Sequence, residues 1–154
     1  MTKNIIGIGA AVQRKEDHRF LTGTGRFSDD IKQPRTLASV VLRSPLPHGE
    51  ITTIDVSAAR AAPGVVLVLT AADLADEIAG PMLSLSNVPP FDIGHRDGRP
   101  GADASQYPLA QDRVRFLGEP VAFVVAETLA QAQDAAERII VDYTPLPSVM
   151  EFED

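Results

Sequence analysis

The chain has 154 residues, of which 44% are hydrophobic and 23% are charged, so its length and composition fit one soluble globular domain with a sizeable core. Its formal net charge is -7 and no basic cluster is longer than Arg14 and Lys15, which argues against nucleic acid or an acidic membrane surface as a partner. The absence of cysteine excludes a disulfide framework, a thiolate nucleophile, and a cysteine-ligated zinc ion or iron–sulfur cluster held by this chain.

Residues 1–34 are predicted to form an N-terminal extended segment that precedes a domain spanning residues 35–154. The first ten residues contain a short apolar run, and a charged stretch begins soon after it at Arg14. This run is short for a signal peptide and far too short to cross a membrane, so the expected location is cytoplasmic. One helical turn is expected within residues 14–21, and residues 26–31 should be extended as far as Pro34.

The first half of the domain is predicted to alternate strands with short helices. Residues 36–43 and 51–55 have the composition or the period-two pattern of strands. A helix over residues 58–62 should be capped by Asp55 or Ser57. The uninterrupted apolar run at 65–69 predicts a strand covered on both faces, and Thr70 should cap a second helix over residues 71–78, with Asp73 in its first turn.

Periodicity disappears between residues 82 and 111, where glycine and proline are frequent. A long stretch of this kind inside a compact domain is either a functional loop or a segment that binds a partner. The alternative is a plain surface loop, because loops also collect insertions that have no function.

The last third of the chain has the clearest pattern: strand, capped helix, strand. Residues 121–126 read as a buried strand, and Thr128 with Gln131 forms a capping box before a helix. Residues 139–143 return to a strand that Pro145 ends. The apolar face of the helix recurs at helical spacing and is rich in alanine, which would let it lie close to a sheet; it consists of Leu129, Ala132, Ala135, Ala136, Ile139 and Ile140. The predicted fold class is therefore α+β, a mixed sheet with packed helices in a single domain.

The residues supply no catalytic, cofactor-binding or metal-binding site by motif. Gly7 and Gly9 suggest a dinucleotide-binding turn, but Val12 stands where the fingerprint needs a third small residue. The remaining candidates lack the context of a site: the histidines are far apart, adjacent acids usually face water, and no serine lies in a nucleophile elbow. These residues are His18, His48 and His95, Asp29 and Asp30, Glu151 to Asp154, and Ser44, Ser57, Ser84, Ser86, Ser105 and Ser148.

Gly118, Glu119 and Pro120 form a sharp entry to the buried strand at 121–126. Glu119 at the edge of a strand could face a partner or a pocket. The more economical interpretation of the bare sequence is a turn that carries a solvated acid.

Three segments, in order, resemble the N-terminal domain of the large subunit of the molybdenum hydroxylases, the family of xanthine dehydrogenase, aldehyde oxidase and aerobic carbon monoxide dehydrogenase. They are residues 14–31 (RKEDHRFLTGTGRFSDDI), residues 42–57 (LRSPLPHGEITTIDVS) with 61–65 and 69–74 after them, and residues 115–147 (RFLGEPVAFVVAETLAQAQDAAERIIVDYTPLP). Together they cover nearly the whole chain except residues 82–111.

The resemblance implies the α/β hammerhead fold, and an enzyme class that hydroxylates a carbon centre or oxidises carbon monoxide at a molybdenum–pterin cofactor. Electrons would leave through iron–sulfur clusters and FAD in companion subunits. In this family the cofactor and the catalytic glutamate belong to the domains that follow the hammerhead, so no catalytic, cofactor-binding or metal-binding residue is carried over to a position in this chain.

The chain is therefore expected to be a structural and interface domain, or a split subunit, of a molybdenum hydroxylase. Its partners would be the cofactor-binding domains, and the isolated chain would have no activity. The alternative is a stand-alone binding module that kept the hammerhead fold without the enzyme. A third possibility, an independent hydrolase or lyase, would need a pocket that brings scattered acids and histidines together.

Overall fold

The computed structural model describes residues 14–31, 33–83 and 105–149. The chain divides into two compact units, residues 1–36 and 37–154. The first contains the helix α1 (Asp17–Leu21) and the 3-10 turn η1 (Ser28–Asp30). The elements of the second, in chain order, are β1 (Ala38–Arg43), β2 (Gly49–Asp55), α2 (Ser57–Arg60), β3 (Val65–Thr70), the 3-10 turn η2 (Ala72–Leu74), β4 (Arg113–Val114), β5 (Pro120–Ala126), α3 (Leu129–Ala136) and β6 (Ile140–Pro145).

In the first unit, the expected helical turn is present as α1, but the extended run at 26–31 is not. The backbone N–H of Phe27 donates to the Asp30 carboxylate over 2.9 Å, which closes the 3-10 turn η1 instead. The rings of Phe20 and Phe27 stack with centroids 5.4 Å apart. Asp30 thus closes a turn while it remains exposed to water, as expected.

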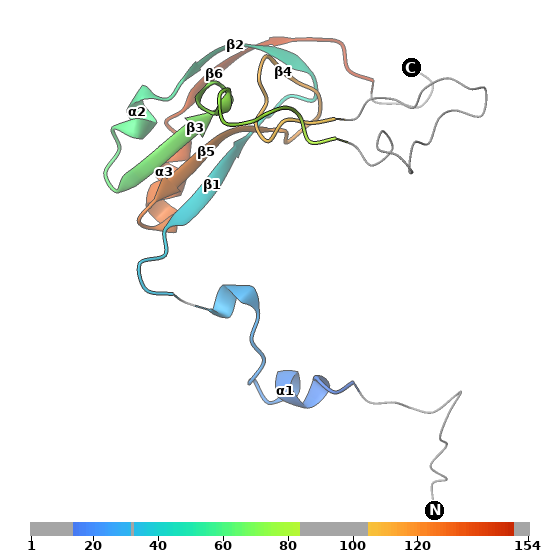
Figure 1. The fold of residues 1–154 in the computed structure, drawn as a ribbon, viewed down its shortest axis with the longest axis vertical. Coiled ribbons are helices and arrows are strands. Elements are labelled where there is room, and N and C mark those ends of the chain that lie inside the picture. Colours follow the sequence, from blue (N-terminus) through green and yellow to red (C-terminus); the bar gives the residue numbers. More distant parts are fainter. Residues whose placement is uncertain (1–13, 32, 84–104, 150–154) are drawn as a thin grey trace, which may run out of the picture. The chain divides into compact units, whose positions relative to one another are not determined.

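The second unit is built on two three-stranded sheets, in the orders β1-β5-β3 and β4-β2-β6 (Figure 1). Every pairing between the described strands is antiparallel. The sequence predicted one mixed sheet, whereas the run β5-α3-β6 places its first strand at the centre of one sheet and its second strand at an edge of the other. The α+β class and the helix packed on a sheet are confirmed.

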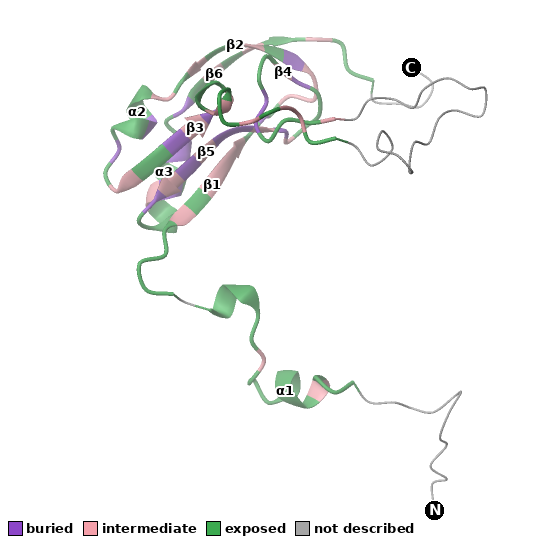
Figure 2. Cartoon of the chain, in the orientation of Figure 1, coloured by how far each residue is buried: buried purple, intermediate pink, exposed green. Residues whose placement is uncertain are grey.

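The main core lies between α3 and the sheet of β1, β5 and β3. Figure 2 shows the buried residues concentrated on β5 and α3. Val124 of β5 and Ala132 and Ala135 of α3 are fully buried, so the alanine face of the helix does approach the sheet closely. A second cluster contains Val114 and Val121. Partly buried Ile54 and Val141, from the other sheet, pack against both clusters and join them into one interior.

The predicted cap at Thr128 is confirmed, whereas Val56 takes the N-cap position of α2 and makes no side-chain cap there. The Thr128 hydroxyl accepts the backbone N–H of Gln131 over 3.3 Å and donates to the Gln131 side-chain carbonyl oxygen over 2.9 Å. The Asp55 carboxylate accepts the backbone N–H of Ser57 over 2.9 Å. Leu129, expected on the buried face of α3, is instead 54% exposed because it lies in the first turn, beyond the edge of the core.

Strand β3 corrects two predictions. It is an edge strand, and Val66 and Leu67 are exposed, so the apolar run is not covered on both faces. The segment after it forms only the 3-10 turn η2 rather than a helix over 71–78. Thr70 does not cap that turn: its N–H and hydroxyl both donate to the Asp73 carboxylate, each over 2.8 Å.

The Asp73 carboxylate also holds Arg60 at the outer side of β3. An Arg60 guanidinium nitrogen donates to Asp73 over 2.8 Å and to the backbone carbonyl of Val68 over 3.2 Å. These contacts occupy backbone groups of an edge strand that would otherwise be open to another strand. We call Arg60 and Asp73 the edge clamp.

Candidate functional site

The turn between β4 and β5, residues 115–119, is held by several hydrogen bonds. The backbone N–H of Glu119 donates to the carbonyl of Phe116 over 3.2 Å. Gly118 has φ +84°, a left-handed conformation that residues with a Cβ adopt only with strain. Glycine at 118 therefore permits the sharp entry into β5 that the sequence predicted.

Contacts with the end of β1 fix this turn. The N–H of Ser44 donates to the carbonyl of Glu119 over 2.9 Å, and the N–H of Gly118 donates to the carbonyl of Ser44 over 3.0 Å. The Arg43 guanidinium donates to the carbonyl of Gly118 over 2.9 Å. The Ser44 side chain is itself buried, and its hydroxyl exchanges hydrogen bonds with the backbone of Leu46. Two segments 75 residues apart in the chain thus hold one rigid corner.

The Glu119 carboxylate lies inside this corner. The residue is 6% exposed, and one carboxylate oxygen accepts the backbone N–H of Arg115. The interpretation of Glu119 as a solvated acid on a turn is wrong, because the contacts of the turn with Ser44 enclose it.

A hollow of about 390 Å³ opens beside this carboxylate. Its lining combines aromatic, amide and charged side chains, which suits a polar group better than a purely apolar one. The residues that line it are Ser105, Gln106, Tyr107, Ala110, Gln111, Asp112, Arg115, Phe116 and Glu119.

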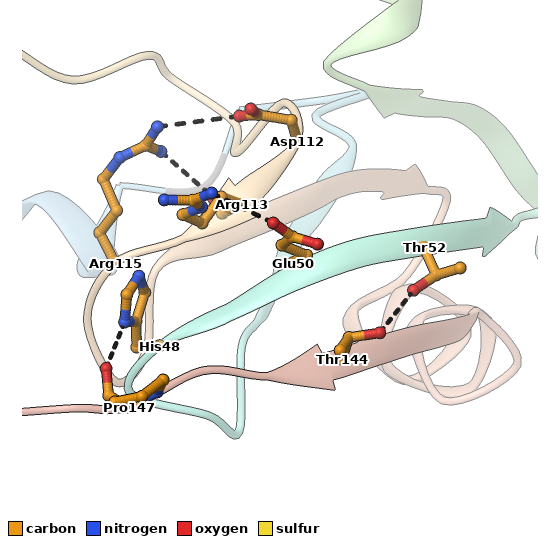
Figure 3. A network of polar contacts seen from close by, with 8 residues as sticks. All are labelled: His48, Glu50, Thr52, Asp112, Arg113, Arg115, Thr144 and Pro147. Carbon is orange, nitrogen blue, oxygen red and sulfur yellow. Dashed lines mark hydrogen bonds and ion pairs between the residues drawn. The ribbon is translucent and has the colours of Figure 1, made fainter.

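Charged side chains continue from the rim of the hollow onto the second sheet (Figure 3). Arg115 donates to the carbonyl of Arg113 over 3.0 Å and lies 3.7 Å from the Asp112 carboxylate. Arg113 in turn pairs with Glu50 over 3.2 Å. The Arg113 Nε is buried and has no hydrogen-bond partner among the residues that the structure describes. The charge of Arg115 is therefore directed toward Asp112 and the backbone.

A second hollow, of about 480 Å³, lies on the other side of Arg115 and Phe116. His48, Pro147 and Val149 are among its lining residues, and the His48 ring nitrogen Nδ1 lies 2.6 Å from the carbonyl oxygen of Pro147. Leu117 and Val149 are 68% and 76% exposed, and Phe116 is 39% exposed. The two hollows and these apolar side chains form one continuous surface with the 115–119 turn at its centre.

Three ionisable groups outside this surface have shifted pKa values. Burial raises the pKa of Tyr143, and a hydrogen bond with Ser44 opposes that shift. Hydrogen bonds from Ser57, through its hydroxyl and its backbone, lower the pKa of Asp55. The backbone and hydroxyl of Thr70 lower the pKa of Asp73, with a smaller contribution from Arg60.

Among the other residues considered from sequence, His48 and Ser148 both line the second hollow, and Ser105 lines the first with Glu119. His18 is exposed on α1, and His48 makes the backbone contact just described, so both have the ordinary roles expected of them. His95, the glycines at 7 and 9, Ser84, Ser86 and the acids at 151–154 lie outside the described residues. Within the described ranges, no three histidine or acidic side chains converge in a way that could hold a metal ion.

Sequence reasoning did not find the aromatic and charged lining of the first hollow. Tyr107, Asp112 and Phe116 follow no local motif, because the hollow forms only where residues 105–112 lie against the 115–119 turn. The single signal was Glu119, whose acidic side chain stands between a glycine and a proline at the start of a buried strand. Among the helices that the structure describes, none combines the length and the apolar character needed to cross a bilayer.

Comparison with known proteins shows a consistent set of relatives. The nicotine 6-hydroxylase large subunit of Paenarthrobacter nicotinovorans is 40% identical over 152 residues, 98% of this chain and 17% of that protein. A solved Cu,Mo-CO dehydrogenase matches with a TM-score of 0.76 and 38% identity, over 97% of this chain and 17% of that one. Quinoline 2-oxidoreductase from Pseudomonas putida 86 matches with a TM-score of 0.78 and 40% identity, over 92% of this chain and 17% of that one.

These relatives are far longer than the present chain, which spans about a sixth of their length. Residues 22–147 match the family model of the aldehyde oxidase and xanthine dehydrogenase a/b hammerhead domain. That match includes both sheets, α3 and the 115–119 turn. The chain therefore belongs to the hammerhead-domain family of aldehyde oxidases and xanthine dehydrogenases.

Proposed function

We propose that this chain is the structural and interface domain of a molybdenum–pterin-dependent hydroxylase, in which partner domains perform the catalysis. The observation that carries the proposal is a difference in coverage: the relatives match almost all of this chain, while the chain matches about a sixth of them. A domain of this size would contribute surfaces to such an enzyme. Residues 35–154 would form the packed domain, and residues 1–34 an N-terminal segment that precedes it.

The surface around the 115–119 turn supports an interface role. Leu117 and Val149 are large apolar side chains that are more than two-thirds exposed, and exposed apolar patches next to hollows mark interaction sites. The turn beneath them is held by contacts with Ser44 and Arg43, so the surface is preorganised for docking.

The cofactors would lie in the partners. A molybdenum–pterin group is expected in the partner domains, and iron–sulfur clusters and FAD in companion subunits. The chain has no cysteine for an iron–sulfur cluster, and its described residues contain no convergent set of three metal-ligating side chains. When bound in the partner, the molybdenum group would supply the oxidation chemistry. This domain would form part of the surface that encloses the group.

The test is co-purification from the native source with this chain tagged, followed by intact mass measurement and molybdenum analysis. The proposal predicts that a longer chain and molybdenum are recovered together, and that the complex oxidises a carbon centre or carbon monoxide whereas the isolated chain does not. Recovery of the chain alone and free of metal would contradict it and would favour a stand-alone binding module.

A further inference from the structure

The Glu119 carboxylate lines the first hollow, although the residue as a whole is almost entirely buried. The residue is 6% exposed, yet its only hydrogen bond among the described residues is the one that it accepts from the backbone N–H of Arg115. None of the ion pairs within the described part of the chain includes it. The carboxylate lines the hollow and makes few contacts within the described part of the chain, so a charged donor that enters the hollow can form a charge-assisted hydrogen bond with it.

The guanidinium of the nearby Arg115 does not pair with the Glu119 carboxylate. Arg115 directs its guanidinium to the carbonyl of Arg113 and toward the Asp112 carboxylate, as Figure 3 shows. Arg115 and Asp112 largely cancel one another at the rim, and both side chains are more than half exposed. Among the described residues that line the hollow, the negative charge that remains is that of Glu119.

The walls of the hollow indicate which donor fits. Tyr107 and Phe116 line it and are 37% and 39% exposed. A guanidinium is planar, stacks on aromatic faces, and presents paired N–H donors that match a carboxylate, whereas an ammonium is a compact and strongly hydrated charge. The volume of about 390 Å³ accommodates a guanidinium together with its methylene stem.

We propose that the hollow between Glu119, Tyr107 and Phe116 is a socket for an arginine side chain of a partner domain. The guanidinium would donate to Glu119 and lie against the aromatic rings, and the stem would leave past the exposed apolar residues of the 115–119 turn. The inference rests on the proposed function for the source of the arginine, but the socket itself is a property of this chain.

The first test uses the full chain and a small probe, N-acetyl-arginine methylamide, titrated while backbone amide shifts are followed by NMR. Saturable shifts are expected at Ala110, Arg115 and Glu119. N-acetyl-citrulline methylamide, which has a similar shape without the charge, should bind at least about tenfold more weakly. Equal binding of the two probes, or arginine-probe shifts spread evenly over the surface, would overturn the proposal.

Two variants and a matched control sharpen the test. Glu119→Gln keeps an acceptor for the Arg115 N–H but removes the charge, and should weaken binding of the arginine probe about tenfold or more. Glu137→Gln removes the same charge from the exposed C-cap of α3 and should bind as the unmodified chain does. If Glu119→Gln does not fold, Phe116→Leu decides: it removes an aromatic wall and should weaken the arginine probe about two- to fivefold, with little effect on the citrulline probe.

The co-purification experiment separates this inference from the proposed function. Glu119→Gln should lower the recovery of the molybdenum-containing chain, whereas Glu137→Gln should not. If the unmodified chain recovers no partner but binds the arginine probe, the socket stands and the proposed function fails. If the partner is recovered equally with both variants, or the unmodified chain does not bind the probe, the socket is refuted.

Discussion

Gly118 offers the sharpest test of how the candidate site is held, because its substitution by alanine adds strain without a clash. Its φ is +84°, and a Cβ built there would have nothing within 4 Å. The cost of Gly118→Ala is therefore that of the left-handed backbone alone, about 1–2 kcal/mol of the free energy of unfolding. In urea, with a typical dependence of about 1–3 kcal/mol per molar, the midpoint should fall by roughly 0.3–2 M.

Gly80→Ala is the matched control. A Cβ at Gly80 also meets nothing within 4 Å, but Gly80 is not among the glycines with positive φ. Alanine there restricts the unfolded chain without straining the folded one, and should stabilise the protein by about 0.4–1 kcal/mol. Gly118→Asn should cost less than Gly118→Ala, since asparagine enters the left-handed region more readily.

The measurement is urea unfolding of the unmodified chain and the three variants, followed by far-UV circular dichroism. The two alanine variants should move the midpoint in opposite directions. Equal shifts for Gly118→Ala and Gly80→Ala, or an unchanged midpoint for Gly118→Ala, would refute the assignment of a strained, glycine-dependent corner at the entry to β5.

Three further predictions concern the core, the edge clamp and the acid response. Val124→Ala removes two methyl groups from a fully buried position and should lower the free energy of unfolding in urea by about 2–3 kcal/mol. The control Val66→Ala, at a position 57% exposed, should lower it by less than about 1 kcal/mol. Similar losses for the two variants would contradict the assigned core. Arg60→Ala uncovers the Val68 carbonyl on the outer side of β3. Sedimentation should therefore show that this variant self-associates more with rising concentration than the control Arg138→Ala does. Identical sedimentation of the two variants would disprove a protective role for the edge clamp. The lowered pKa of Asp73 in the folded chain gives stability that is present above its ordinary pKa and lost as the pH falls through the lower folded pKa. Asp73→Asn should therefore lose less stability than the unmodified chain between about pH 5 and about pH 3 in thermal unfolding, and an unchanged acid loss would show that the carboxylate does not contribute.

The parts of the fold that could be predicted are those determined by local signals. An apolar run indicates the strand at 121–126. A cap and alanines at helical spacing indicate the helix after Thr128. All of these depend on residues within a few positions of one another. The family resemblance was confirmed on the same segments.

The parts that could not be predicted depend on distant pairing. An apolar run such as 65–69 looks the same at the centre of a sheet as at its edge, and only the position of β3 beside β5 leaves Val66 exposed. Glu119 was interpreted as solvated because nothing near it in the sequence encloses it. Its burial follows from Ser44, whose backbone pairs with the turn across most of the domain.

The helix expected over residues 71–78 failed for a related reason. Thr70 suits the N-cap of a helix, but in the folded chain Asp73 takes the N–H and hydroxyl of Thr70 and the guanidinium of Arg60. The acid that should have favoured a helix N-terminus instead closes a 3-10 turn against the edge of β3.

The pairing of the two sheets also determines when this domain can fold during synthesis. β1 and β2 leave the ribosome before their partners β5 and β6. The hydroxyls of Thr52 and Thr144, which hydrogen-bond to one another, are 92 residues apart in the chain. The sheet of β1, β5 and β3 cannot form until β5 has emerged, so the apolar strands β1 and β3 remain unpaired until then. The other sheet is completed only when β6 follows. Such a delay exposes strand edges to other nascent chains. The domain should therefore depend more on chaperones during translation than during refolding of the purified domain in dilute solution.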